Sequence, residues 1–274
     1  MRKSLGTAEG WHVLHAFYRL EPSARRELAK PSNLKSLEKE FISLVRAAHK
    51  QKDFQILTFS MVGHKADIGF MVLSADLVSL HHFDKQLAAL LAAENISATY
   101  SYLSMTETSE YTTSPEEHAA QLEREEKLKP GSPEFEAKLK EFKVRMEVYL
   151  QHRLYPQLPP WPVVCFYPMC KRRSGEKNWY MLNFETRKKL MEGHARVGRR
   201  YSGKILQLIT GSTGLDEWEW GVTLFAHDLL MIKQIVYEMR FDEVSAAYAD
   251  FGDFYVGLQV QPKELISSAI GKEA

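Results

Sequence analysis

The stretch ADIGFMVLSADLVSL, residues 66–80, decides the fold because its pattern occurs a second time. Residues 219–232 read EWGVTLFAHDLLMI. In both stretches an apolar run typical of a strand leads directly into Asp-Leu, and aspartate is favoured at the position just before a helix. The sequence therefore predicts that one strand-to-helix unit is built twice.

The elements around the first stretch follow a simple order. Hydrophobic alternation predicts strands, and helical spacing of apolar residues predicts helices. The strands are expected at 10–19, 54–63, 66–74 and 99–111, and the helices at 31–50 and 76–93. The predicted order is strand, helix, strand, strand, helix, strand.

The same order surrounds the second stretch. Strands are expected at 162–171, 204–212, 219–226 and 253–260, and helices at 184–203 and 228–248. We therefore predict an α+β protein in which two tandem ferredoxin-like (βαββαβ) repeats form a dimeric α/β-barrel-like domain. The expected boundaries are 8–112 for the N-terminal repeat, 113–160 for an insert and 161–260 for the C-terminal repeat.

The insert is charged and predicted to be helical. Ser114-Pro115-Glu116-Glu117 has the form of a capping box with proline at the first helical position. A helix is expected to restart after Pro130-Gly131. The simplest interpretation is a solvated helical linker, followed by a rigid proline-rich loop at LYPQLPPWP, residues 154–162.

The composition is typical of a soluble globular protein and excludes some functions. The 274 residues are 45% hydrophobic with a formal net charge of +1, so neither nucleic acid nor an anionic membrane is an expected partner. No apolar run is long enough to span a bilayer, and no secretory signal is evident. Cys165 and Cys170 are predicted to lie on opposite faces of one strand, too far apart to form a disulfide. We expect a reduced, cytoplasmic protein.

The strand at 162–171 carries an unusual row of side chains. Its alternation places Tyr167, Met169 and Lys171 on one face, with Pro168 and Cys170 on the other. A proline here predicts a sheet edge or a bulge. The row is either an ordinary core tyrosine with a lysine that reaches water, or the wall of a cavity that offers a redox-capable phenol and a cation.

The helix at 184–203 contains a histidine on its apolar face. His194 falls on the stripe of Leu190 and Val197, which predicts a buried position. Such a histidine is either a core residue bonded to a neighbour or an axial haem ligand. Gly193 and Gly198 would let a flat cofactor approach the helix closely.

Two arginines fit an anionic cofactor, and one polar residue interrupts an apolar strand. Arg153 and Arg199 are either solvated or paired with carboxylate arms of a ligand. Gln207 is polar within an otherwise apolar strand, and the simplest interpretation is a sheet-face amide that meets solvent or a backbone partner. The sequence shows no nucleophile elbow, P-loop or dinucleotide fingerprint.

Five stretches together resemble a known family. They are FYPMCKRR (166–173), NWYML (178–182), EGHARVGRRYSGKILQLITGS (192–212), WEWGVTLFA (218–226) and YEMRFDEVSAAYADFG (237–252). They resemble the chlorite dismutase-like superfamily and, within it, the coproheme decarboxylase branch. The resemblance spans nearly the whole chain and is densest from Leu154 to Gly257.

This resemblance implies a peroxide-dependent haem synthase. Iron coproporphyrin III would bind to the C-terminal repeat and lose the carboxyl groups of two propionates, which become vinyls, giving haem b. Hydrogen peroxide would be the oxidant. The implied assembly is a homopentamer, with a transient contact to coproporphyrin ferrochelatase.

The resemblance also implies roles for individual residues. His194 would be the proximal iron ligand. Tyr167 would form the radical that takes hydrogen from the propionate β-carbon, and Lys171 would position the propionate. Further cofactor-binding positions are implied at Tyr111, Arg153, Pro168, Met169, Cys170, Arg199, Gln207 and Ser245.

Some positions separate the alternatives within the family and beyond it. Gln207 stands where chlorite dismutases carry an arginine, which argues against chlorite chemistry. Cys170 stands where the family more often has serine, and the insert is longer than in familiar members. The other hypotheses are a chlorite dismutase, a non-catalytic haem carrier or sensor, which needs no Tyr167 radical, and a haem-free barrel with a structural His194.

Overall fold

The computed structural model describes residues 4–272, which form two compact units. One unit contains the chain up to Thr106 and again from Leu158 onward, and the other is Glu107–Gln157. Within the described residues, no helix has the length and apolar character needed to cross a membrane.

The first half of the larger unit has the predicted order of elements. Its strands are β1 (His12–Leu20), β2 (Phe54–Met61), β3 (Ile68–Ser74) and β4 (Ile96–Thr106). Its main helices are α2 (Pro31–His49) and α3 (Leu77–Ala93), with a short α1 (Pro22–Leu28). All strand pairs are antiparallel, in the order β4-β1-β3-β2. This arrangement is the predicted ferredoxin-like repeat.

The second half repeats the pattern. Its strands are β5 (Val163–Lys171), β6 (Ile205–Gly211), β7 (Trp220–Ala226) and β9 (Tyr255–Val260), and its main helices are α6 (Phe184–Arg199) and α7 (Leu229–Met239). Five short elements complete it: η1 (Trp179–Met181), α8 (Glu243–Tyr248), β8 (Ala249–Phe251), η2 (Pro262–Glu264) and α9 (Leu265–Ala269).

The two repeats join into one closed sheet. β4 pairs with β6 and β2 pairs with β9, while β5 pairs with both β7 and β9, so eight strands form a ring with β8 added beside β5. Closure removes the unpaired edges that each repeat alone would expose. The predicted α+β barrel of two ferredoxin-like repeats is confirmed.

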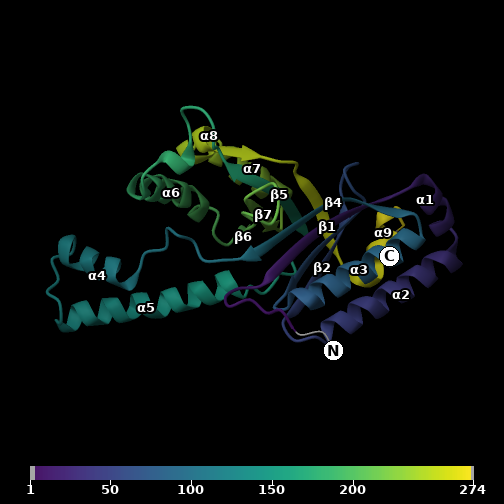
Figure 1. Cartoon of the computed structure of the whole chain (residues 1–274), viewed down its shortest axis with the longest axis horizontal. Helices are drawn as coiled ribbons and strands as arrows, with labels where there is room; N and C mark the ends of the chain where they lie inside the picture. The colour runs from purple at the N-terminus through teal and green to yellow at the C-terminus, as the bar shows by residue number, and fades with distance from the viewer. Residues whose placement is uncertain (1–3, 273–274) are drawn as a thin grey trace. The chain divides into compact units, whose positions relative to one another are not determined.

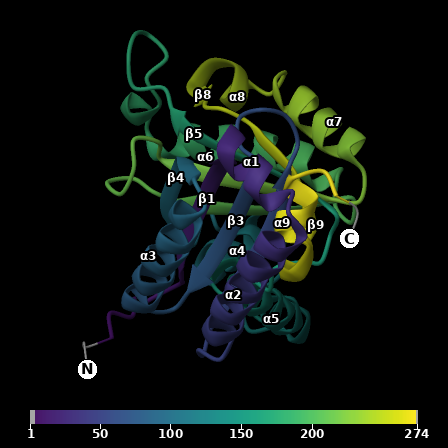
Figure 2. The ribbon, with the colours of Figure 1, turned by 90° about the vertical axis from the view of Figure 1, so that its right-hand side faces the viewer.

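Alternation along the strands divides the core into three layers. The outer face of the first half packs against α2, α3 and α9 around residues such as Phe41 and Phe70. The outer face of the second half packs against α7 around Ile232 and Ile235. Figures 1 and 2 show these helices on the outside of the sheet.

Aromatic side chains fill the inside of the barrel. Phe17, Tyr102, Phe166 and Tyr255 form one interior cluster. Gly221 is needed beside it, because a Cβ there would lie 2.6 Å from Tyr102 Cε1. The interior is therefore a packed core, and the outer face of the C-terminal repeat is left as the surface that can carry a site.

Two predicted elements differ from the structure, and the pairing at Pro168 is irregular. The predicted helix 228–248 is broken into α7 and α8, because the Asp242 side chain caps α8 by accepting the Ser245 N–H at 3.2 Å. The strand predicted at 99–111 is instead β4, Ile96–Thr106. The sheet edge or bulge predicted at Pro168 corresponds to a local break in the pairing: Pro168 pairs with Gly221 of β7, but neither register on the other side of β5 pairs it. Pro168 lies where its neighbour changes from β9 to β8.

The smaller unit is a helical hairpin of α4 (Pro115–Arg124) and α5 (Pro133–Leu154). The predicted capping box of Ser114 and Glu117 is present. The unit has buried apolar residues of its own, Leu122, Phe135 and Phe142, so it is more than an extended linker. The loop that follows, up to Pro162, has no regular structure, as its prolines predict.

Candidate functional site

Strand β5 presents its two faces to different layers. Cys165, Tyr167 and Met169 point into the outer cluster of the C-terminal repeat, whereas Phe166 points into the barrel. The predicted sharing of one face by Tyr167 and Met169 is thus observed. Tyr167 lies opposite Val222, a residue of the same outer cluster.

Gln207 belongs to the same outer face. Its neighbours two residues away on β6, Ile205 and Ile209, are members of the outer cluster, and alternation places Gln207 with them. Gln207 pairs with Leu224, and Leu224 pairs with Cys165. Gln207 therefore lies two strands across and two residues along the sheet from Tyr167. At ordinary strand spacings this corresponds to roughly 12 Å between the two Cα atoms.

Tyr167 is enclosed by aromatic rings. Its ring stacks on Phe254 at 4.4 Å between centroids, with Phe251 at 6.0 Å. The guanidinium of Arg240 lies 3.9 Å from the centre of the Phe251 ring. Burial, with a smaller contribution from Cys165, raises the pKa of the Tyr167 phenol well above its ordinary value, and Arg240 opposes this shift. Tyr167 is therefore a protonated phenol at neutral pH.

His194 is held by an aspartate from another element. Its Nδ1 lies 2.8 Å from Asp242 Oδ2, in the turn between α7 and α8. The expectation that His194 lies on a buried helix face is wrong: no residue of α6 is buried, and the His194 side chain is 22% exposed. The apolar stripe of α6 is therefore only partly covered by the protein.

Asp242 is ionised, which fixes the histidine tautomer. Burial alone would raise the pKa of Asp242, but the contact and charge of His194, the Ser245 N–H and the charge of Lys171 lower it overall. A carboxylate only accepts hydrogen bonds, so His194 Nδ1 donates. In the neutral ring Nε2 then carries the lone pair that a metal requires.

Lys171 lies at the end of β5 with only 8% of its surface exposed. Its Nζ lies 4.5 Å from the centre of the Trp179 ring. Burial lowers the pKa of Lys171 to about 8, and the charges of Asp242 and Glu219 oppose the shift. The fold therefore brings Lys171, Asp242 and His194 into one electrostatic group, with Ser245 bonded to Asp242.

The surroundings of α6 fit a flat, mostly apolar ligand. A Cβ added at Gly193 would meet nothing within 4 Å, whereas one at Gly198 would touch Met239. Gly193 lies three residues after Leu190 and four before Val197, so it belongs to the same apolar stripe as His194. Apolar side chains of α6 and of the outer sheet face stay half-exposed. They are Leu190 and Val197 on α6, and Met169, Ile209, Phe251 and Phe254 on or beside the sheet. A macrocycle with carboxylate arms would find apolar contact, an imidazole nitrogen and an ammonium here.

The remaining predicted site residues are distributed as follows. Pro168 is buried in β5, Cys170 is half-buried, and Arg199 is exposed in the last turn of α6. Cys165 and Cys170 are both free thiols, as predicted. Tyr111 and Arg153 belong to the helical unit, where Arg153 Nε donates to Glu107 O at 3.0 Å. Their approach to His194 stays a prediction.

Sequence reasoning missed Asp242, Trp179 and Glu219. Asp242 had a detectable signal, because an aspartate with a serine three residues later is a pattern that begins a helix. The contacts of Trp179 and Glu219 with Lys171 had none, since the first depends on how the loop after β5 folds back and the second on how the segment before β7 lies beside the end of β5. Two surface hollows along α2 contain none of the predicted site residues.

Comparison with known proteins agrees with this fold. A family model described as chlorite dismutase matches residues 35–260. A solved structure of a heme-binding protein from Thermus thermophilus is 36% identical, with 98% of each chain covered and a TM-score of 0.77. Chlorite dismutase from Candidatus Nitrospira defluvii, in complex with imidazole, is 15% identical over 96% of this chain and 97% of that chain, with a TM-score of 0.72. The second likeness concerns the fold alone.

Proposed function

Because the chain belongs to the chlorite dismutase family, we propose that it is a coproheme decarboxylase. In this proposal it converts two propionates of iron coproporphyrin III to vinyls with hydrogen peroxide and gives haem b. The protein would work in the cytoplasm as a homopentamer, with a transient contact to a ferrochelatase.

One observation carries the proposal more than any other. Asp242 fixes His194 on α6, a helix whose apolar face is left open. Tyr167 lies on the sheet face that packs with Tyr201, and Tyr201 follows directly after α6 in the chain. The relative from Thermus thermophilus is described as heme-binding, which supports a bound porphyrin. In the proposal His194 Nε2 binds the iron.

Tyr167 would carry the oxidation to the propionate. When bound, iron coproporphyrin supplies the centre at which peroxide is reduced. The Tyr167 phenol gives up a hydrogen atom, and its radical then takes one from the propionate β-carbon. For each propionate, one carboxylate, one H₂O₂ and one proton give one vinyl, one CO₂ and two waters. The side chain loses two electrons and peroxide gains them.

Lys171 would hold the propionate that reacts. An ammonium removed from water attracts a carboxylate more strongly than an exposed one, since the local dielectric is lower. Carboxylate contacts are also proposed for Tyr111, Arg153, Arg199, Ser245 and the segment Pro168–Cys170. Gln207 is proposed to face the peroxide side of the macrocycle.

A haem carrier is the second candidate, because the 36% identical relative is described only as heme-binding. A carrier needs His194 and an apolar surface, but it does not need a phenol beside the propionates. Chlorite dismutase activity is disfavoured by Gln207, an uncharged amide at the position where the resemblance implies an arginine.

The deciding experiment uses iron coproporphyrin III and a peroxide titration, with products followed by mass spectrometry. We expect stepwise loss of two carboxyl groups in the wild type. Tyr167→Phe should bind the porphyrin and leave its carboxyl groups intact. Tyr201→Phe is the matched control, because Tyr201 is in the same cluster but donates its hydroxyl to Glu238 at 2.6 Å. This control should stay active. Binding without decarboxylation by the wild type would favour the carrier.

A further inference from the structure

Glu219 is a buried carboxylate that the proposed chemistry does not use. It directly precedes β7 and is only 5% exposed. Its Oε2 accepts the backbone N–H of Lys171 at 2.8 Å. Its own backbone N–H donates to Met169 O at 3.1 Å, and its carbonyl accepts from Ser212 N at 2.7 Å. The residue is therefore held firmly beside the end of β5.

The charge of Glu219 is only partly compensated by these contacts. Arg173 Nη1 lies 4.0 Å from Oε1, and the Arg173 side chain is 65% exposed, so water weakens this pair. A buried carboxylate needs a cation or several hydrogen bonds to offset its desolvation. The ammonium of Lys171 is beyond ion-pair distance of Glu219, but both groups are buried beside the 2.8 Å contact, and the negative charge of Glu219, after that of Asp242, favours the charged form of Lys171.

The loop after β5 encloses this pair. Trp179 N donates to Arg172 O at 2.9 Å, and the Arg172 guanidinium binds Asp250 at 3.0 Å. The Trp179 ring meets Tyr248 edge-on at 5.5 Å and lies under the Lys171 ammonium at 4.5 Å. The ammonium therefore has an indole face on one side and carboxylates nearby.

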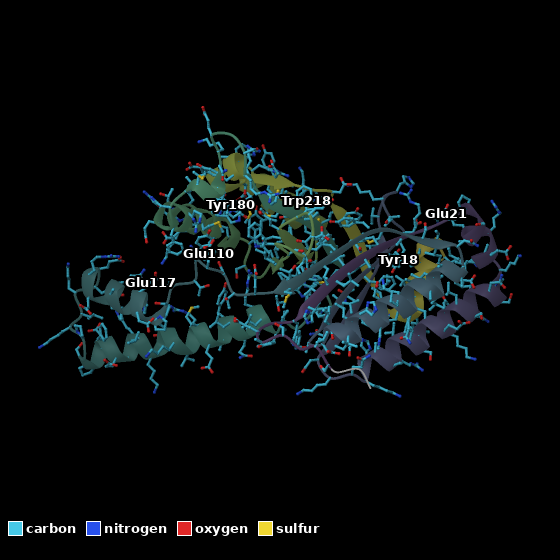
Figure 3. All side chains as sticks on the ribbon, viewed as in Figure 1. Tyr18, Glu21, Glu110, Glu117, Tyr180 and Trp218 are labelled. Atoms are coloured by element: carbon cyan, nitrogen blue, oxygen red, sulfur yellow. The ribbon has the colours of Figure 1, made fainter. Side chains whose placement is uncertain are left out.

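A partly exposed tyrosine, Tyr180, also interacts with Glu219. Tyr180 is 48% exposed, and Figure 3 shows it in the segment that leads into α6. Burial, a hydrogen bond from the Tyr180 hydroxyl to Glu219 and the charge of Glu219 raise the pKa of the Tyr180 phenol, so this phenol is neutral and helps to satisfy the carboxylate. It adds no charge to the pair.

We propose that Glu219 is a positioning residue for Lys171. It fixes the end of β5 by accepting the Lys171 N–H, and its negative charge keeps the buried ammonium protonated. The first part follows from the 2.8 Å contact, and the second from the shared burial of the two charges. The consequence for a bound propionate rests on the proposed function, but the effect on Lys171 does not.

Other charged or titratable groups also face this region. Asp242 adds negative charge from the turn between α7 and α8, and Arg173 adds positive charge from the loop after β5. Cys170 directly precedes Lys171 on β5, and it pairs with Asp250 of the neighbouring strand β8. The test must therefore change Glu219 alone.

The test follows the titration of Lys171 by NMR in protein without porphyrin, labelled with ε-¹³C lysine. The signal is assigned by its loss in Lys171→Arg. Glu219→Gln keeps an oxygen that can accept the Lys171 N–H but removes the charge. We expect it to lower the Lys171 midpoint by roughly one pH unit, as for loss of a nearby opposite charge. Glu217→Gln, at an exposed position two residues earlier, should leave the midpoint unchanged.

A second variant separates charge from side-chain shape. Glu219→Asp keeps the charge but shortens the side chain, so the Lys171 midpoint should stay within a few tenths of a unit of the wild type. The proposal is overturned by an unchanged midpoint in Glu219→Gln, or by a drop of a full unit in Glu219→Asp. Either result would leave Glu219 as a backbone cap only.

A binding measurement then connects this site to the proposed function. Affinity for iron coproporphyrin III should begin to fall at a lower pH in Glu219→Gln than in the wild type. If the wild type binds no porphyrin, the proposed function fails while the NMR result for Lys171 still stands. The two failures are therefore distinguishable.

Discussion

His194 Nδ1 donates to Asp242 Oδ2 across 2.8 Å and thereby ties α6 to the break between α7 and α8. The same carboxylate accepts the Ser245 N–H that begins α8. One aspartate therefore ends a helical run, begins the next helix and orients the candidate metal ligand. This shared use explains why the break in the helix lies at the site.

Replacing Asp242 should weaken porphyrin binding without unfolding the protein. Asp242→Asn keeps a good helix cap but loses the charged acceptor that orients His194. We expect affinity for iron coproporphyrin III to fall about 10- to 100-fold, as is typical for partners of metal-ligating histidines. An absorbance titration measures this change.

Asp228→Asn provides the matched control for that experiment. Asp228 caps α7 through the Leu230 N–H at 2.8 Å. The same substitution there should leave porphyrin affinity at the wild-type value. Equal losses of porphyrin affinity in both variants would mean that weaker helix capping, rather than the lost contact with His194, explains the loss in Asp242→Asn.

Porphyrin affinity should fall as the pH rises through about 8. Burial lowers the pKa of Lys171 to about 8, so the ammonium is present below this pH and is lost above it. In Lys171→Arg the guanidinium stays charged, and affinity should persist to higher pH. Binding titrations between pH 6.5 and 9.5 test this. A wild-type profile that stays flat over this range would remove Lys171 from carboxylate binding.

Gly193→Ala should separate the stability of the protein from its binding. Alanine stabilises a helix interior by roughly 0.5–1 kcal/mol over glycine, and a Cβ here meets no atom within 4 Å. We expect a small gain in urea-unfolding free energy but several-fold weaker porphyrin binding. Gly198→Ala, whose Cβ faces Met239, should bind like the wild type. Unchanged affinity in Gly193→Ala would place the ligand away from this face.

The protein should lose stability below pH 6.5 because of His15. This histidine is fully buried in the barrel, where Nε2 lies 2.9 Å from Thr223 Oγ1, and burial lowers its pKa to about 3. Between pH 6.5 and about pH 3, the unfolded chain binds a proton at His15 that the folded chain does not. Stability therefore falls with decreasing pH by about 1.4 kcal/mol per unit from this residue.

Urea unfolding of His15→Gln measures this contribution, since glutamine is neutral at every pH. The variant should lose less stability between pH 6.5 and 4.5 than the wild type. His82→Gln, at an exposed position on α3, should retain the wild-type slope. Identical slopes in wild type and His15→Gln would contradict burial of a neutral imidazole.

Local pattern predicted most of the fold. Alternating and helically spaced apolar residues predicted the order of both repeats, and the doubled stretch at 66–80 and 219–232 predicted that the two halves share one pattern. Prediction failed where one side chain outweighed the pattern. Helical periodicity continued through Asp242, but its bond to the Ser245 N–H started a new helix.

The sequence by itself determined which residues share a strand or a helix face, because backbone periodicity places them there. It put Tyr167 and Met169 together and set His194 on an apolar stripe. Only the tertiary structure decided that this stripe stays open, and that Asp242, Glu219 and Trp179 gather around His194 and Lys171. These residues come from separate loops and turns, and contacts between such segments depend on how the whole barrel closes rather than on any local spacing.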